Sequence, residues 1–598
     1  MENRSPKRSE VKEEFTWNLK DIFASEEDFE AALKAASAYP SRLKEYEGRL
    51  ADSAAVLLDF LKLQDEIGES LEKIYGYANL KSDEDTGDSE GQIRKGKAMN
   101  LYVSIIGSLA FSTPEIINIE DSVLDAFYAE EPELETYRRP LTKIRRTRDH
   151  ILDKNCEAIL ARVSDIARGP DRIGGILRNA DLKFGDVEDS EGNMHPLTSG
   201  SFVLLEESGD RTLRMNAFRE VYGKYGSLKN TFASILDNQF KQLLFYSQVR
   251  KYGSTLEASL DRTEVPVSVY HNLIDAVHSN FDKMHKYVSL RKKFLGVPEL
   301  HMYDVYVPIV GDYDKKITFE EAKATVKDAL AVLGPDYIGI LEEGFNNRWI
   351  DVYENEGKRS GAYSSGSSRP HPYVLLNHKD NLDSCFTLAH EMGHALHSYH
   401  STKNQPVCTS DYVIFVAEVA STVNEVLLMR HMLSKSSDKK ERAYLINHFL
   451  EQFKSTVYRQ TMFAEFELTM GKMAEEGITL TADSLCAKYL ELNKSYFGPD
   501  MVSDEEISLE WARIPHFFYN YYVFQYATGF SAAVAIAEKI LSEGKPAVCA
   551  YKQFLSSGSS TDPISLLKIA GVDMSTPEPV NSGLRLFGEL LDEFEKLM

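Results

Sequence analysis

The sequence of 598 residues has little cysteine, and its cysteines are scattered. The five of them are widely spaced and include no C-x-x-C pair: Cys156, Cys385, Cys408, Cys486 and Cys549. An odd, dispersed set in a long chain argues against a disulfide framework and against a cysteine-based zinc site. The N-terminal stretch also lacks the apolar core of a signal peptide, so we expect a cytoplasmic protein.

Positive charge and long apolar runs are scarce as well. The chain has 68 Lys and Arg against 92 Asp and Glu, a formal net charge of -24. Such a surface repels phosphate backbones, so we expect no nucleic-acid partner. The most apolar stretch, Tyr102 to Phe111, is too short to span a bilayer and predicts a core helix instead of a membrane segment. No oligomeric state is predicted.

Over most of the sequence the apolar residues recur with the spacing of helices, which predicts a mostly α fold. Ser25 precedes apolar residues at helical spacing and has the position of an N-cap. Gly185, Gly192 and Pro196 interrupt this pattern and indicate a boundary. We therefore expect an N-terminal helical region at 1–190 and a catalytic domain at 191–598.

Short β-branched or aromatic segments appear only in the middle of the chain. Gly, Pro, Ser or Asn bound each of them, so they predict a small group of strands at 304–307, 349–353, 361–363 and 373–376. A helix capped by Thr318-x-x-Glu321 separates the first two. Everything after the last strand is again predicted to be helical.

The segment that follows the last strand contains an H-E-x-x-H pattern. On a helix, residues four apart differ by about 40° around the axis, so His390 and His394 can share one ion. Glu391 is placed to act on a water molecule at the open side of the metal. Asn381 or Asp383 would cap this helix. The alternative is a surface helix with two unrelated histidines.

A third protein ligand must come from elsewhere, and two candidates compete. His400 lies where zinc peptidases with the pattern H-E-x-x-H-x-x-G-x-x-H place their third histidine. Those enzymes need glycine at the position that His397 occupies here, because the chain must turn back. If the helix continues, His400 points away from the metal, and we expect His397 to line the cleft.

The second candidate is Glu418, in the predicted helix 411–429. That helix is apolar nearly all round and should be buried, yet Glu418, Ser421, Thr422 and Glu425 form one polar stripe. Buried carboxylates need a cation or hydrogen-bond partners, and a zinc ion on two histidines would be one such cation. A buried salt bridge is the alternative for Glu418. Glu425 is either a hydrogen-bond acceptor for a ligand histidine or part of a structural ion pair.

A segment near the C-terminus, 515–529, is rich in aromatic residues. Pro515 suits the first turn of a helix. On a helical wheel, His516, Tyr519, Tyr522 and Tyr526 then share one face, and Tyr521 points elsewhere with the phenylalanines. Phenols and an imidazole on one face could donate hydrogen bonds to the oxyanion formed when water attacks a peptide carbonyl. A core helix whose hydroxyls find partners is the alternative.

These motifs, in this order, resemble a known family. HEMGHALHSYHS, then FVAEVASTVNE, and later HFFYNYYVFQYATGF are similar to oligoendopeptidase F, in the thimet oligopeptidase-like family of zinc metallopeptidases. GKRSGAYSSGSSRPHPYVLLN, before the metal helix, resembles the family too. The resemblance runs from about Phe15 to the C-terminus.

The resemblance implies one zinc ion held by His390, His394 and Glu418, with Glu391 as the base. It also implies that His516, Tyr522 and Tyr526 are the best matches for residues that face the substrate. The implied fold is a large helical metallopeptidase with a deep substrate channel and a small sheet beside the metal helix. Substrates would be short, unfolded peptides cut at internal bonds.

Two rival functions remain open on the sequence. One is a peptide-binding protein that keeps zinc without catalysis, against which Glu391 argues, because a binding protein does not need a base there. The other is a carboxypeptidase or dipeptidyl carboxypeptidase of the same chemistry, which needs a cationic anchor for the substrate C-terminus. Cobalt or manganese could replace zinc as the working metal.

Overall fold

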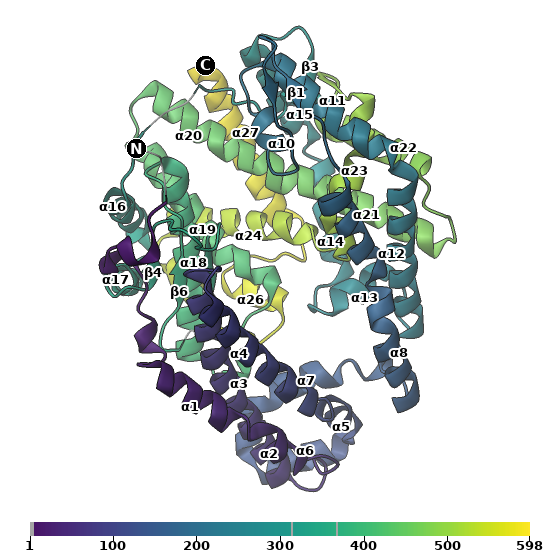
Figure 1. Ribbon diagram of the computed structural model, residues 1–598, viewed down its shortest axis with the longest axis vertical. Helices are drawn as coiled ribbons and strands as arrows, with labels where there is room; N and C mark the ends of the chain where they lie inside the picture. The colour runs from purple at the N-terminus through teal and green to yellow at the C-terminus, as the bar shows by residue number, and fades with distance from the viewer. Residues whose placement is uncertain (1–4, 312–314, 366–368) are drawn as a thin grey trace. The chain divides into compact units, whose positions relative to one another are not determined.

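The computed structural model describes residues 5–311, 315–365 and 369–598 (Figure 1). The described residues are mostly helical, which confirms the predicted fold class. They form two compact units, neither continuous in sequence. The first unit is Met1–Asp149, Asp314–His431 and Ile536–Gly571, and the second is His150–Tyr313, Met432–Ala535 and Val572–Met598. The expected division by role, 1–190 and 191–598, stays a prediction.

The first unit contains the small sheet and the helices around it. Its strands are β4 (Ile350–Asp351), β5 (Tyr363–Ser365) and β6 (Tyr373–Leu375). Its helices are α1 (Glu26–Ala36), α2 (Tyr39–Lys44), α3 (Ala54–Asp83), α4 (Ser89–Ser108), α5 (Ser112–Asn118), α6 (Asp121–Glu130), α7 (Arg138–Arg145), α16 (Phe319–Leu330), α17 (Pro335–Asn346), α18 (Leu382–Asn404), most of α19 (Ile414–Lys435), the end of α24 (Phe524–Glu543), α25 (Lys545–Leu555) and α26 (Pro563–Ile569). Ser25 and Thr318 cap α1 and α16 as predicted.

The sheet has the strand order β4-β6-β5 and packs against α18, as predicted (Figure 1). β4 pairs with β6 in parallel, and β5 pairs with β6 antiparallel. Tyr373 and Leu375 on β6 are fully buried and close the apolar core that the N-terminal helices build. The predicted segments 349–353 and 373–376 are therefore confirmed as strand regions, and the one at 361–363 begins two residues later than expected.

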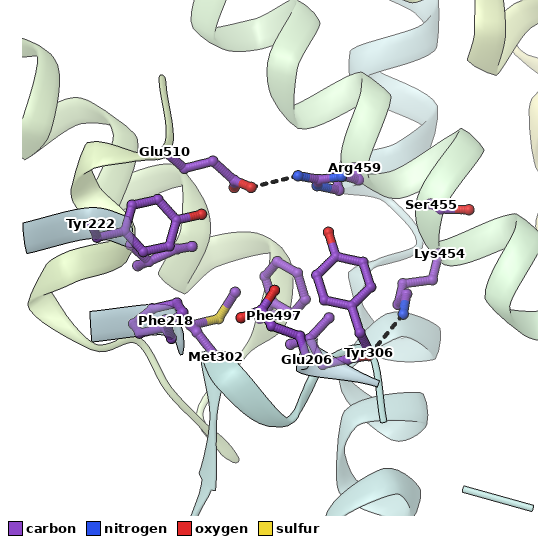
Figure 2. Close-up of a pocket in the computed structure, with 12 residues that line it drawn as sticks. Glu206, Phe218, Tyr222, Met302, Tyr306, Lys454, Ser455, Arg459, Phe497 and Glu510 are labelled. Atoms are coloured by element: carbon purple, nitrogen blue, oxygen red, sulfur yellow. Dashed lines mark hydrogen bonds and ion pairs between the residues drawn. The ribbon is translucent and has the colours of Figure 1, made fainter. Parts of the chain in front are cut away.

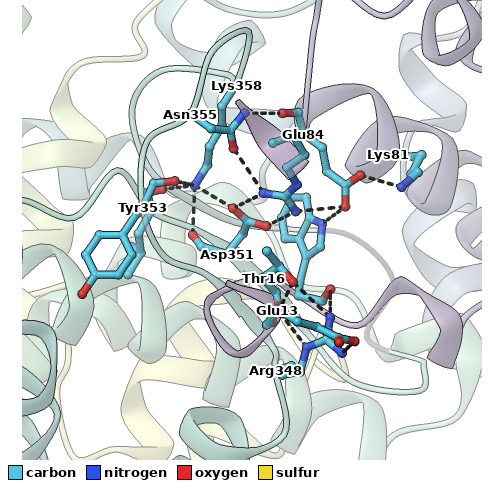
Figure 3. A network of polar contacts seen from close by, with 12 residues as sticks. Glu13, Thr16, Lys81, Glu84, Arg348, Asp351, Tyr353, Asn355 and Lys358 are labelled. Atoms are coloured by element: carbon cyan, nitrogen blue, oxygen red, sulfur yellow. Dashed lines mark hydrogen bonds and ion pairs between the residues drawn. The ribbon is translucent and has the colours of Figure 1, made fainter. Parts of the chain in front are cut away.

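A buried charge network ties the N-terminal segment to β4 (Figure 3). The carboxylate of Asp351 pairs with Lys358 at 2.7 Å and also with Arg8. Arg8 bonds in turn to Glu84, which accepts a hydrogen bond from the indole of Trp17 at 2.8 Å. Burial lowers the pKa of Lys358, so its charge depends on this carboxylate. The network fixes the outer edge of the sheet.

The second unit is almost entirely helical. Its helices are α8 (Lys154–Ala167), α9 (Gly169–Ile176), α10 (Phe202–Glu206), α11 (Arg211–Ser227), α12 (Lys229–Val249), α13 (Thr255–Asp261), α14 (Val267–His278), α15 (Phe281–Leu295), α20 (Lys439–Gln452), α21 (Arg459–Glu475), α22 (Ala482–Phe497), α23 (Glu510–Arg513), the start of α24, and α27 (Glu578–Leu597). Leu177–Asp181 and Phe453–Tyr458 are π-helical. The two-residue strands β1 (Val187–Glu188) and β2 (Met194–His195) form a hairpin, and β3 (Leu300–His301) pairs with β7 (Met501–Val502).

The predicted strand at 304–307 is wrong. Residues 302–304 form a 3-10 turn, and side chains satisfy the carbonyls that a neighbouring strand would otherwise bind. Arg291 donates from Nε to the carbonyl of Asp304 at 2.9 Å, and Lys454 donates to that of Val305 at 3.0 Å. Long-range polar contacts therefore replace the expected strand pairing.

The apolar stretch at 102–111 lies mainly on α4 and is less buried than predicted. Leu109 begins the turn after the helix, and Val103 and Ile106 remain 61% and 45% exposed. Among the described residues, no single helix is long and apolar enough to cross a membrane. Two consecutive segments, Ser89–Asn118 and Asp121–Glu130, satisfy the criteria of length and composition only when they are taken together, and the pair is bent by 103°.

Candidate metal centre

Helix α18 carries the H-E-x-x-H pattern and begins at a polar cap. The side chain of Asn381 accepts a hydrogen bond from the backbone N–H of Ser384 at 2.9 Å. Of the two predicted capping residues, Asn381 is therefore the one in use. This cap satisfies an otherwise unpaired N–H group and fixes the register of the helix two turns before the first histidine.

Three side chains from two helices meet in the first unit. His390 and His394 on α18 place their Nε2 atoms 3.2 Å apart, with their rings nearly perpendicular. Glu418 on α19 brings Oε2 to 3.5 Å from each of these nitrogens. The three ligand atoms lie within 4.8 Å of one another. The structure thus brings together the three residues predicted as metal ligands.

Glu425, which lies two turns after Glu418 on α19, accepts a hydrogen bond from Nδ1 of His390. This contact fixes the ring and directs its Nε2 toward His394 and Glu418. Burial lowers the pKa of His390, but the hydrogen bond and charge of Glu425 outweigh it and raise that pKa to about 9. The site therefore favours positive charge at this imidazole.

Glu391 is only 7% exposed, and burial raises the pKa of its carboxyl group. It accepts a hydrogen bond from the backbone of Ser364 on β5, while its Oε2 has no hydrogen-bond partner among the described residues. An orphaned carboxylate oxygen beside three ligand atoms suits a base that acts on water. Sequence reasoning missed Ser364, because the predicted strand ended at residue 363.

Gly393 lets α18 and α19 approach closely. A Cβ built on it would lie 2.6 Å from the Cα of Ser421 and 2.8 Å from the carbonyl oxygen of Ala420. Asn424 adds a direct tie by donating to the carbonyl of Ala389 at 3.1 Å. The two helices that carry the ligands are held together by backbone contact.

The two remaining histidines of α18 lie away from these ligands. His397 was expected to line the cleft, but it is 1% exposed and stacks on Tyr412 at 3.8 Å between ring centroids. Burial lowers its pKa to about 3, so it is a neutral core residue. His400 stacks on Tyr337, and burial lowers its pKa to about 4. It does not join the cluster that His390, His394 and Glu418 form.

The donor set suits one divalent metal ion. Two imidazole nitrogens and a carboxylate oxygen are the ligands of catalytic zinc sites that keep one position open for water. Both histidines offer Nε2, and each of these atoms is as close to Glu418 as the other. Three donors converge on one point without rearrangement of the backbone.

The aromatic segment of the second unit is not the continuous helix that the sequence predicted. Residues 515–518 form a 3-10 turn, and α24 begins only at Phe524. Between them, Asn520 and Tyr521 have positive φ angles of 54° and 60°. Gln239 on α12 holds this turn by donating to the Phe518 carbonyl and to the Asn520 side chain. A distant residue thus breaks the helix.

The predicted grouping of side chains nevertheless holds. His516 lies 5.4 Å from Tyr519 and 6.0 Å from Tyr526 between ring centroids, and Tyr522 lies 5.4 Å from Tyr526. Tyr521 is 2% exposed and shares a hydrogen bond with Thr255 instead. These four rings, His516, Tyr519, Tyr522 and Tyr526, form one cluster of polar-tipped groups.

Two protein-family models match the chain. The model of peptidase family M3 matches residues 204–586, and that of the oligopeptidase F N-terminal region matches 115–184. Oligopeptidase PepF of Bacillus subtilis is 47% identical over 100% of this chain and 89% of its own. Group B oligopeptidase PepB of Streptococcus agalactiae is 39% identical over 99% of both chains.

Solved structures show the same likeness. A putative peptidase from Chlamydophila abortus is 36% identical, with a TM-score of 0.94 and full coverage of both chains. Oligoendopeptidase-F from Enterococcus faecium is also 36% identical, with a TM-score of 0.75 over 96% of this chain and 99% of its own.

Proposed function

Because the chain belongs to peptidase family M3, we propose that His390, His394 and Glu418 hold one zinc ion and that Glu391 is the base of peptide hydrolysis. The chain is a metalloendopeptidase that acts on oligopeptides. The observation that carries the site assignment is the convergence of three ligand atoms within 4.8 Å beside the buried, half-satisfied carboxylate of Glu391.

When bound, zinc supplies Lewis-acid chemistry that lowers the pKa of water and polarises a carbonyl group. Glu391 accepts the proton of the attacking water, because its Oε2 has no hydrogen-bond partner among the described residues and its carboxylate interacts with the charges of the three ligand residues. The raised pKa of Glu391 lets it hold that proton and then donate it to the leaving amine. Ser364 keeps the carboxylate oriented through its backbone N–H.

The polar-tipped cluster of the second unit supplies hydrogen-bond donors in this proposal. His516, Tyr522 and Tyr526 would donate to the oxyanion of the tetrahedral intermediate. Burial and the charge of Arg459 lower the pKa of His516, so its imidazole is neutral at pH 7 and donates from one nitrogen. We expect a cytoplasmic enzyme with short peptides as partners and without nucleic-acid or membrane partners, because its surface is strongly acidic and its cysteines are unpaired.

The proposal is tested with one unbiased pool of synthetic peptides and mass spectrometry of the products. The purified enzyme should cut internal bonds, a chelator should stop it, and zinc should restore it. Release of only one or two residues from the C-terminus would instead indicate a carboxypeptidase-type activity. Cleavage that survives removal of all metal would contradict the assigned site.

A further inference from the structure

The second unit contains a pocket of about 470 Å³ that no part of the proposed chemistry uses. Helix α9 and the π-helical turn after it form one wall, α10 and α11 form another, and the start of the aromatic segment closes it. Its size is that of a site for a small ligand or a side chain. Among its polar lining residues are Arg178, Asn179, Ser199, Arg513 and Tyr519.

Arg178 is the unusual member of this lining. Four arginines among the described residues are less than 9% exposed: Arg94, Arg178, Arg214 and Arg291. Three of them pair with a carboxylate, at 2.9 Å from Arg94 to Glu26, 2.8 Å from Arg214 to Asp304 and 2.9 Å from Arg291 to Glu451. Arg178 alone among these four has no carboxylate within 4.0 Å in the part of the chain that the structure describes.

The guanidinium of Arg178 is held in place by an aromatic ring. Its Cζ lies 4.9 Å from the ring centroid of Phe518, and burial lowers its pKa. It lies on the π-helical turn Leu177–Asp181, a geometry that is rare and concentrated at functional sites. No described residue accepts a hydrogen bond from its five N–H donors. A fixed, desolvated cation without a partner is costly unless a ligand supplies the anion.

The neighbouring cavity shows what the same unit does when it buries a charge for structure. There Arg459 pairs with Glu510, and Lys454 binds a backbone carbonyl (Figure 2). Arg513, which lines the pocket of Arg178, also pairs with Glu510, at 2.6 Å. Structural cations of this unit therefore have internal acceptors, and Arg178 differs from them.

The chemistry of the pocket selects a carboxylate. A guanidinium binds a carboxylate through two parallel hydrogen bonds, and Asn179 and Ser199 add neutral donors. Asp171 lies on the exposed rim and contributes one negative charge close enough to influence Arg178. That charge disfavours a phosphate dianion more than a singly charged carboxylate.

We propose that Arg178 binds a carboxylate of the peptide substrate, either its C-terminus or an acidic side chain. This inference rests on the proposed function, because Pro515 and Tyr519 line the pocket and Tyr519 belongs to the cluster assigned to the substrate. The pocket is thus continuous with the segment that handles the peptide. Arg178 is a specificity-determining residue, and it has no part in bond cleavage.

The test uses one oligopeptide in three forms: the free acid, the C-terminal amide, and the free acid with its internal Glu replaced by Gln. Wild type and Arg178→Met are compared by kcat and KM, and by calorimetric Kd on a zinc-loaded Glu391→Gln background. If Arg178 binds the C-terminal carboxylate, Arg178→Met should raise the Kd of the two free acids about 10–100-fold and leave the Kd of the amide unchanged. If Arg178 binds the acidic side chain, the same change should raise the Kd of the two peptides that contain Glu and leave the Kd of the Gln form unchanged. The peptide form whose Kd does not change in Arg178→Met therefore identifies which carboxylate Arg178 binds.

Two further variants sharpen the result. Arg172→Met removes an exposed arginine from α9, the helix just before the π-helical turn of Arg178, and should change nothing. Asp171→Asn should lower the Kd for a peptide that carries the recognised carboxylate severalfold. Arg178→Met should melt no lower than wild type, because it removes an uncompensated buried charge. A large fall in its melting temperature would show that the guanidinium is structural and would overturn the proposal.

Equal acid-to-amide and Glu-to-Gln ratios in wild type and Arg178→Met would also overturn it. Failure of the proposed function is a different outcome. It would appear as a wild-type protein that hydrolyses none of the three peptides with any metal, while the binding ratios still report on Arg178.

Discussion

The Cα of Ser421 on α19 lies 2.6 Å from where a side chain on Gly393 of α18 would begin. No residue but glycine fits there, because the obstructing atoms belong to the backbone. The separation of the two ligand-bearing helices, and with it the reach of Glu418 to both histidines, is therefore set at a position that does not contact the metal.

Gly393→Ala should push the two helices apart. We expect a loss of stability of about 1–3 kcal/mol and a lower zinc content after dialysis. Gly339→Ala on α17 is the matched control, because nothing lies within 4 Å of its added Cβ, and it should be neutral or stabilise the protein by up to about 1 kcal/mol. Full zinc content in Gly393→Ala would contradict this account of the site.

Glu391→Gln should keep its metal and lose its activity. The amide preserves the size of the side chain but cannot accept a proton, and general acid–base catalysis contributes about 10²–10⁴-fold to rates. Metal content by plasma emission and kcat with a quenched peptide report the two effects separately. Asp383→Asn, exposed in the first turn of the same helix, is the control and should be fully active. A Glu391→Gln enzyme near wild-type rate would refute the mechanism.

Glu418→Ala should lose metal, whereas His400→Ala should keep it. Glu418 Oε2 lies 3.5 Å from both histidine nitrogens, while His400 stacks on Tyr337. Glu425→Gln should weaken metal binding by an intermediate amount, about 10–100-fold, because Glu425 fixes the orientation of the His390 ring through its Nδ1. Metal titrations of the three variants decide the ligand set. Zinc retained without Glu418 and lost without His400 would reverse the assignment.

Tyr522→Phe or Tyr526→Phe should lower kcat and kcat/KM together. An interaction made only in the transition state behaves this way, and loss of one oxyanion donor costs about 10²–10³ in kcat. Tyr521→Phe is the control. Its hydroxyl bonds to Thr255, so its removal should cost about 0.5–1.5 kcal/mol of stability without slowing the reaction. If Tyr519, Tyr522 and Tyr526 can all be replaced by Phe without effect, the cluster is only core.

The pH dependence of stability should contain a contribution from Glu467. It is fully buried, accepts the backbone N–H of Tyr521 and leaves Oε2 without a partner, and burial raises its pKa from 4.5 to about 8. Between these values the folded state binds more protons than the unfolded state, so stability falls as pH rises, by about 1 kcal/mol per pH unit. Glu467→Gln should flatten the unfolding free energy across this window.

The control for Glu467 is Glu476→Gln, which replaces an exposed carboxylate at the end of the same helix. It should keep the wild-type slope of stability against pH. An unchanged slope in Glu467→Gln would show that this carboxyl group titrates normally despite its burial.

The metal helix could be predicted because its signals are local. The spacing of His390 and His394 and the cap at Asn381 concern residues within a few turns of one helix, and the polar stripe that contains Glu418 is visible in its own helix. The face of the helix on which each of these side chains lies follows from the helical periodicity of the sequence. The structure brings His390, His394 and Glu418 together and uses Asn381 as the cap.

The aromatic segment and Arg178 could not be predicted in the same way. Gln239, almost 300 residues before Asn520, holds the turn that breaks the expected helix, and no local pattern reports such a contact. The strand expected at 304–307 fails for the same reason, since Arg291 and Lys454 bind its carbonyls. Arg178 stands out only because a carboxylate is missing beside it, and sequence does not show an absent neighbour.

The first unit is assembled from three separated parts of the chain, and this has a consequence for synthesis on the ribosome. Its N-terminal part ends at Asp149, and its next part begins about 165 residues later. At about 5–20 residues per second, the interval is about 8–33 s. During that time the apolar surface that Tyr373 and Leu375 later close is exposed to water on the nascent chain. A chaperone that recognises this transient surface would therefore bind before the metal helix has emerged.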